Sequence, residues 1–310
     1  MMFVARGLLV SLAFFAAVYC PLSLLVLLAW RGVKHIGHAT AGSNANLWFG
    51  LRILPFTVSA AITVFFTFPS FWLLERRALD EDTGTFALAL CSLIILGAGL
   101  FRVFKLQART TRTVRQWLLA PTIAEGADSV VLSASHGAPA LIVVGVRRPR
   151  VMVSDRASNV LSEDELRIAL RHEFGHVRSR DNLKKVLISA TPFPGMGDIE
   201  RAWQEAGELA ADEAAVGNRR EALDLASALI KLSRYSKPWP EPLSAIGLVS
   251  ASCSIDSRVR RLLQWRAPER RGEHARHWIL LVLFIVILVV GSNYGATLML
   301  THRLTEVLVP

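Results

Sequence analysis

Two histidines, His172 and His176, stand four residues apart, and Glu173 directly follows the first. Positions four apart face the same side of an α-helix, so both imidazoles can bind one metal ion from a rigid support. The adjacent glutamate is then within reach of a metal-bound water, whose pKa a zinc ion lowers to about 7. The pattern predicts a zinc centre in which Glu173 is the general base for peptide-bond hydrolysis.

The residues before this motif predict the helix that carries it. Ser162 with Glu165 three residues later has the sequence of a capping box, which starts a helix. Apolar residues then recur at helical spacing: Leu166, Leu170, Phe174 and Val177. We expect this stripe to face the protein core and the two histidines to face another side.

A second predicted helix carries two acids four residues apart, Glu208 and Asp212. Glu208 is the candidate third metal ligand, and Asp212 can accept a hydrogen bond from the outer nitrogen of a metal-bound histidine. The alternative is that both are solvated helix charges near Arg219 and Arg220. Asp181 is a further candidate for the second shell of the metal, although its place near a helix C-terminus favours a structural role.

Three segments ahead of the motif are rich in β-branched residues and predict strands. Residues 129–134 and 140–146 are separated by a short stretch with Gly137 and Pro139, which predicts a hairpin, and residues 150–154 predict a third strand. Together with the helices they predict one α+β domain over residues 106–276.

Long apolar runs lie at both ends of the chain, which has 310 residues, 52% of them hydrophobic. A bilayer span needs about 20 mostly apolar residues. Four segments meet this requirement, at about 8–30, 53–74, 86–104 and 278–300. The first is too long for the apolar core of a signal peptide, which has about 7–15 residues. We therefore expect three spans within residues 1–105, and a fourth span with a short external tail within 277–310.

The formal charge of +10 is concentrated beside these apolar runs. Lys and Arg weight the loop after the first span (Arg31, Lys34 and Arg52) and both flanks of the central domain, which predicts that these parts are cytosolic. Topology therefore accounts for the charge, and we expect no direct nucleic-acid binding. The three cysteines form no disulfide framework. The sequence predicts a multi-pass protein of the cell (inner) membrane.

Several segments in this order resemble the BlaR/MecR-type membrane metallopeptidases. They are residues 145–151, 161–166, the HEFGH motif at 172–176, Arg180-Asp181-Asn182-Leu183, the stretch 208–212 and the arginine-rich stretch 258–263. The resemblance implies a gluzincin-like, Zn²⁺-dependent peptidase domain that faces the cytosol. It also implies a role in signal transduction, as an antirepressor that cleaves a transcriptional repressor.

One departure from this family concerns the sensor. Well-known members carry an extracellular penicillin-binding domain after the last span, whereas here only about ten residues, 301–310, follow it. The resemblance therefore does not carry β-lactam sensing to this chain, and a separate sensor protein is an expected partner.

The sequence thus predicts an α-helical membrane protein with four transmembrane helices and an inserted α+β zinc peptidase domain that cleaves a cytosolic or membrane-proximal protein. Two alternatives remain open. One is a quality-control metalloprotease of the CAAX-protease or heat-shock type, which typically places two spans after the motif. The other is a non-catalytic zinc-binding transducer, against which the intact Glu173 argues.

Overall fold

The computed structural model describes residues 2–33, 41–74, 83–117, 123–124, 131–134, 139–234, 245–247, 254–266 and 294–308. The chain divides into two compact units. The first comprises Met1–Gly32, Ile53–Gly97 and Pro268–Pro310, and the second comprises Val33–Arg52 and Ala98–Ala267. Helices α2 (Ala41–Ile62) and α4 (Thr83–Trp117) contribute to both units.

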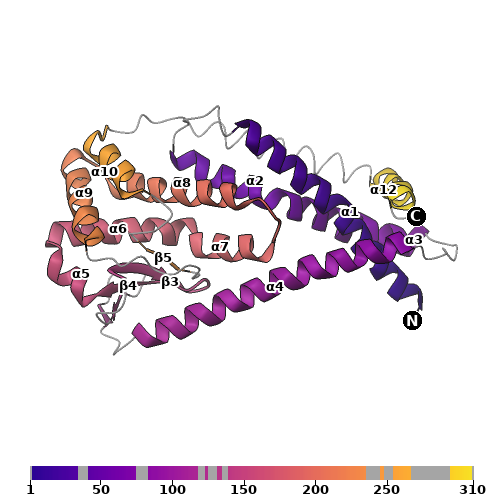
Figure 1. Ribbon diagram of the computed structural model, residues 1–310, viewed down its shortest axis with the longest axis horizontal. Helices are drawn as coiled ribbons and strands as arrows, with labels where there is room; N and C mark the ends of the chain where they lie inside the picture. The colour runs from indigo at the N-terminus through magenta and orange to yellow at the C-terminus, as the bar shows by residue number, and fades with distance from the viewer. Residues whose placement is uncertain are drawn as a thin grey trace. The chain divides into compact units, whose positions relative to one another are not determined.

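The first unit is helical. Besides parts of α2 and α4, it contains α1 (Met2–Val33), a π-helical turn (Thr63–Thr67), α3 (Phe68–Leu74) and α12 (Tyr294–Leu308) (Figure 1). Three helical stretches are long and apolar enough to cross a membrane: Phe3–Gly32, Ala45–Leu74 and Thr83–Trp117. They contain the first three predicted spans, and large apolar side chains such as Leu25 and Leu100 are 60% and 73% exposed on them. Such surfaces fit contact with lipid.

The fourth predicted span, 278–300, falls mainly outside the described residues. Only its end is seen, as the start of α12, and this helix continues to Leu308 through residues that the sequence assigned to an external tail. The structure therefore describes three candidate spans, and the fourth stays a prediction.

Helix α2 begins well before the second predicted span, so Arg52 is a helical residue rather than a loop residue. Its guanidinium is 1% exposed. The Nε atom donates to Glu200 Oε1 at 2.9 Å and an Nη atom donates to the Thr191 carbonyl oxygen at 2.7 Å. The prediction of a loop position for this charge was wrong, because these partners hold Arg52 inside the second unit.

The second unit contains a five-stranded sheet in the order β1-β2-β4-β3-β5. Its strands are β1 (Ile123–Ala124), β2 (Val131–Ala134), β3 (Leu141–Val144), β4 (Arg150–Ser154) and β5 (Ala245–Gly247). Strands β2 and β4 are parallel, and the other neighbours are antiparallel.

The predicted hairpin between residues 129–134 and 140–146 was wrong, because β4 lies between β2 and β3. Val151 and Met152 of β4 are completely buried, and the backbone of this central strand is hydrogen-bonded to a neighbour on each edge. The hairpin in the structure joins β3 to β4, and Gly145 in its turn has a φ of +93°. This left-handed backbone is one that glycine adopts without a steric cost.

Six helices complete the described part of the second unit: α5 (Asp155–Val160), α6 (Glu163–Ser179), α7 (Asp181–Ala190), α8 (Gly197–Ala215), α9 (Arg219–Ser233) and α10 (Ile255–Leu263). Alternate residues of β3 face opposite sides of the sheet. Leu141 and Val143 join a core with residues of α6, α9 and α10, whereas Ile142 and Val144 pack with Trp117 at the end of α4. Buried contacts therefore cover both sheet faces and fix the α6 helix.

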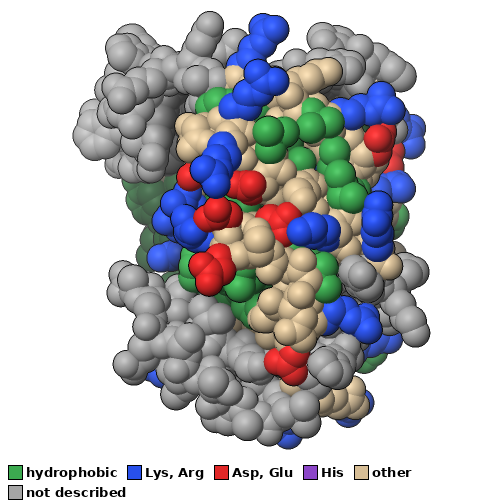
Figure 2. All heavy atoms as spheres, turned by 90° about the vertical axis from the view of Figure 1, so that its left-hand side faces the viewer, with side chains coloured by type: hydrophobic (Ala, Val, Ile, Leu, Met, Phe, Trp, Pro, Cys, Tyr) green, Lys and Arg blue, Asp and Glu red, His purple; other side chains and the backbone are tan. Residues whose placement is uncertain are grey.

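The outer face formed by the ends of α6 and α9 has mixed charge. Figure 2 shows acidic side chains lying among the basic ones on this side of the molecule. Arg171 pairs with Glu221 at 2.8 Å, and Asp164 pairs with Arg167 and Arg220. Such exposed pairs contribute about 0–1 kcal/mol each. These exposed pairs keep the face polar, and they do not form the buried site described next.

Candidate metal centre

Helix α6 carries the histidine motif, and its start is fixed as predicted. The Ser162 hydroxyl accepts from the Glu165 backbone N–H at 3.3 Å, and the Glu165 carboxylate accepts from the Ser162 backbone N–H at 2.8 Å. Glu165 also accepts from Ser227 and Lys231 of α9. Burial alone would raise the pKa of Glu165, but these donors lower it below its ordinary value. The helix is thereby held both at its cap and to its neighbour.

Helix α8 packs directly on the motif and brings a third side chain to it. The Nε2 atoms of His172 and His176 are 3.2 Å apart. Glu208 Oε2 lies 3.5 Å from His172 Nε2, and Glu208 Oε1 lies 3.9 Å from His176 Nε2. All three side chains are buried and offer ligand atoms within 4.8 Å of one another. Ligand atoms around a tetrahedral zinc ion are about 3.2–3.6 Å apart, so the group can hold a metal ion.

The close approach of the two helices depends on a glycine. Gly175 lies inside the HEFGH motif, and a Cβ atom at this position would be 3.3 Å from the Cα atom of Ala211. This separation is tighter than ordinary van der Waals contact. The small residues on both helices therefore let Glu208 reach the histidines.

Each histidine has a carboxylate at its outer nitrogen. His172 Nδ1 lies 2.9 Å from Asp212 Oδ1, and His176 Nδ1 lies 2.8 Å from Asp181 Oδ2. Asp181 comes into reach because Arg180, between α6 and α7, has a left-handed φ of 54° that turns the chain back toward His176. An ionised carboxylate only accepts, so each Nδ1 carries the hydrogen and each Nε2 turns a lone pair inward.

Two lone pairs that point into the same space are stabilised by a cation between them. Burial disfavours the imidazolium form of His172, yet the Asp212 and Glu208 carboxylates raise its pKa to about 9. Burial would also raise the pKa of Glu208 and Asp212, but the Arg258 charge holds both below their ordinary values. The centre therefore favours a positive charge at the point where the three side chains meet.

The charges around the centre fit a bound cation. Four buried carboxylates meet there: Glu173, Glu208, Asp212 and Asp181. Among the described residues, two cationic side chains pair with members of this set, Arg258 with Glu208 and Asp212, and Lys184 with Asp181 at 3.3 Å. Buried charges persist only when they are compensated, so the carboxylates without such a pair favour a bound cation at this point.

Glu173 is completely buried beside the two histidines. Neither of its carboxylate oxygens has a hydrogen-bond partner within the described parts of the chain. Burial raises the pKa of this carboxyl to about 7. A buried acceptor without a partner is costly to stability, which indicates that its partner is a bound molecule rather than the protein.

Sequence reasoning missed one member of the site, Arg258. The sequence placed Arg258 within the arginine-rich stretch of the family resemblance and gave it no role in the site, and the structure buries it against Glu208 and Asp212. A signal was present, because Arg258 falls between Ile255 and Leu262 at helical spacing on the apolar side of α10. By contrast, Arg260 and Arg261 of the same stretch are exposed and pair with Asp256 and Glu213.

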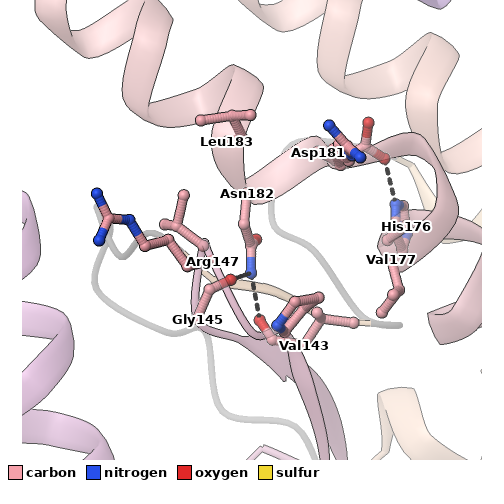
Figure 3. Close-up of a pocket in the computed structure, with 11 residues that line it drawn as sticks. Val143, Gly145, Arg147, His176, Val177, Asp181, Asn182 and Leu183 are labelled. Atoms are coloured by element: carbon pink, nitrogen blue, oxygen red, sulfur yellow. Dashed lines mark hydrogen bonds and ion pairs between the residues drawn. The ribbon is translucent and has the colours of Figure 1, made fainter. Parts of the chain in front are cut away.

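A cavity of about 450 Å³ adjoins the centre at His176. Its lining includes Val177, the β3–β4 turn and Asn182 (Figure 3). The Asn182 Nδ2 atom donates to the carbonyl oxygens of Val143 and Gly145 at 3.0 and 2.9 Å, which fixes the amide. Its Oδ1 atom has no partner within the described residues. The cavity therefore offers a buried acceptor and space next to His176.

Comparison with known proteins supplies an independent finding. No curated protein matches the chain. The sequence model described as BlaR1 peptidase M56 matches residues 21–262, which is most of the chain and includes the metal centre and α2. Together with the buried His-His-Glu group, this match identifies the chain as a metallopeptidase. The protein belongs to the BlaR1 peptidase M56 family.

Proposed function

We propose that this protein is a membrane-embedded zinc endopeptidase that cleaves a cytosolic or membrane-proximal protein. His172, His176 and Glu208 would bind Zn²⁺, and Asp212 and Asp181 would orient the two imidazoles. The observation that carries the proposal is the buried Glu173, whose carboxylate lies beside the converging His-His-Glu group and has no hydrogen-bond partner among the described residues.

In this proposal each residue of the site has a separate role in peptide-bond hydrolysis. A zinc ion held there would supply Lewis acidity toward the substrate carbonyl and activate a water for attack. Glu173 would take a proton from the attacking water and donate it to the leaving amine. The cavity at His176 offers room for the substrate chain beside the scissile bond. The contacts of the two imidazole Nδ1 atoms with the Asp212 and Asp181 carboxylates would keep both imidazoles in the metal-binding tautomer.

The family supports a role in signal transduction, with a transcriptional repressor as the proposed substrate. This role requires residues 106–276 to lie in the cytosol, which the distribution of Lys and Arg favours. It also requires an inducing signal, which we assign to a separate sensor protein or to the membrane helices. The family match disfavours a heat-shock or CAAX-type quality-control protease.

The test is the substitution Glu173→Gln in the full-length protein in its membrane. Gln has nearly the same shape but cannot take a proton, so we expect turnover to fall by about 10²–10⁴-fold. Bound zinc, measured by elemental analysis of the purified protein, should stay at one ion per chain. Cleavage is measured in cells, on the repressor candidate, and with purified protein in nanodiscs.

The matched control is Glu213→Gln, which makes the same change on the exposed side of α8, where Glu213 pairs with Arg261. This variant should keep wild-type cleavage. Unchanged processing in the Glu173→Gln variant would refute the peptidase proposal. That result would favour a transducer that binds zinc without cleaving.

A further inference from the structure

Helix α10 buries one arginine of an arginine-rich stretch. The Arg258 side chain is 1% exposed, whereas Arg260 two residues later is 75% exposed. Arg258 lies on the side of α10 that carries Ile255, Val259 and Leu262 to the core. A guanidinium removed from water is tolerated only where acids meet it in good geometry. The acids that pair with Arg258 therefore explain why its side chain is buried.

Those partners are the two acids of α8 that belong to the metal centre. The Nε and Nη2 atoms of Arg258 lie 2.8 and 2.6 Å from the two carboxylate oxygens of Asp212. Its Nη1 atom lies 2.9 Å from Glu208 Oε2. One guanidinium thus donates hydrogen bonds to both oxygens of Asp212 and forms an ion pair with one oxygen of Glu208.

Each acid in turn contacts a histidine. Asp212 Oδ1, which accepts from Arg258, is also 2.9 Å from His172 Nδ1. Glu208 Oε2, beside Arg258 Nη1, is also 3.5 Å from His172 Nε2. The Arg258 guanidinium therefore fixes the distance between a carboxylate at the outer nitrogen of His172 and a carboxylate at its inner nitrogen.

The shape of the group matters as well as its charge. A guanidinium presents its donors in a rigid plane, whereas a lysine ammonium is a point charge on a flexible chain. A single lysine ammonium at this position could not contact both oxygens of Asp212 and Glu208 at the same time in this geometry. The two acids sit one helical turn apart on α8, so an arginine from a separate helix can clamp them together.

We infer that Arg258 is a positioning residue of the metal centre, which presents Glu208 to the metal and fixes Asp212 against His172. The inference rests on the proposed function, because it takes Glu208 as a metal ligand. It makes the metal affinity of the α6–α8 site depend on a side chain of α10. Arg258 itself is bound to two carboxylates and takes no part in proton transfer.

The test measures the Zn²⁺ dissociation constant of the full chain in detergent, by competition with a chromophoric chelator. Arg258→Lys keeps the positive charge but removes the planar set of guanidinium donors. We expect it to weaken zinc binding by about 10–100-fold, as the loss of an outer-shell partner does. The visible spectrum of the Co²⁺-loaded protein should also change, because the arrangement of ligands changes. Arg258→Met should weaken binding further.

The matched controls are Arg260→Lys and Arg260→Met, made on the exposed face of the same helix, and both should bind zinc like the wild type. Circular dichroism of the metal-free proteins separates folding from binding. A purely structural role would lower the melting temperature of Arg258→Lys and leave its zinc affinity and Co²⁺ spectrum unchanged.

The decisive outcome is the affinity of Arg258→Lys, which folds with the charge retained even if Arg258→Met does not. A dissociation constant within about twofold of the wild type would overturn the inference, since outer-shell partners ordinarily matter more than that. This outcome is separate from the fate of the proposed function. Zinc affinity is read without substrate, so absence of peptidase activity would refute the proposed function and leave the Arg258 comparison intact.

Discussion

At the scale of single residues, the centre consists of charged groups whose partners are other charged groups. His176 is held by Asp181, and Asp181 is held by Lys184 Nζ at 3.3 Å. Lys184 in turn lies 3.0 Å from Asn46 Oδ1 of α2. The proposed metal ligand His176 is therefore oriented by a chain of contacts that reaches the first half of α2.

This chain of contacts predicts the effect of Asp181→Asn. The amide is neutral and can turn an N–H toward His176 Nδ1, which disfavours the metal-binding tautomer. We expect zinc affinity to fall by about 10–100-fold and cleavage to fall with it at limiting zinc. The measurement is the chelator competition described for Arg258.

The comparison variant is Asp198→Asn, at an exposed residue that pairs with Arg201 at 2.6 Å on α8. It should bind zinc normally. Equal affinities for Asp181→Asn and Asp198→Asn would show that Asp181 only braces the junction of α6 and α7.

At the scale of elements, the site depends on how closely α6 and α8 pack. Gly175 and Ala211 face each other at this contact, and neither helix can move without moving a ligand. The capping box and the pair of Glu165 with Lys231 hold α6 from the other end. Packing thus fixes the two helices, and the positions of the helices set the geometry of the metal site.

This dependence predicts that Gly175→Ala is harmful although alanine favours helices. The added Cβ atom meets Ala211 at 3.3 Å, so the helices must separate by a few tenths of an ångström. We expect a loss of about 1–3 kcal/mol in the free energy of unfolding, as for an overpacked core. Zinc affinity should fall too, because Glu208 moves away from the histidines. Urea unfolding in detergent and chelator competition measure the two effects.

Gly207→Ala is the matched control, because this glycine lies in α8, the other helix of the contact, and a Cβ atom there has no neighbour within 4 Å. Alanine should stabilise the helix by about 0.5–1 kcal/mol and leave zinc binding unchanged. If both variants behaved alike, the close approach of α6 and α8 would not be what positions Glu208.

At the scale of the whole molecule, the chain combines apolar helices with a unit that holds buried charges. Helix α2 serves both parts: residues Ile53–Ile62 belong to the first unit, and Arg52 bonds to Thr191 and Glu200 inside the second. Because Arg52 is buried and paired, it is not one of the free loop charges that fix topology. The orientation prediction rests on the remaining Lys and Arg residues.

That orientation predicts the behaviour of reporter fusions. Gly217 is an exposed residue between α8 and α9, a position where an insertion is tolerated. A fluorescent protein that matures only in the cytosol should fluoresce there, and a phosphatase that folds only outside should be inactive. Reporters at Asp80, between the second and third predicted spans, should give the opposite pattern. An active phosphatase at Gly217 would place the metal centre outside the cell.

Local sequence signals predicted much of what the structure contains. The capping box at Ser162, the apolar stripe and the His-Glu-His spacing depend only on helical periodicity, and each was correctly placed. The pairing of Glu208 with the histidine motif was also predictable, since acids four apart share one helix face. The first three apolar segments appear as helices long enough to span a membrane for a similar reason, because length and apolar composition are properties of the sequence itself.

Only the tertiary structure decided which distant elements meet. The predicted hairpin was wrong because β4 lies between β2 and β3, and the local composition of a strand does not specify which strands pair with it. The burial of Arg52 and Arg258 depends on carboxylates 148 and 46 or more positions away in the chain. The sequence alone determined the reactive groups and the helices that carry them. Their geometry was decided by packing, because buried charges are stable only where folding brings compensating charges to them.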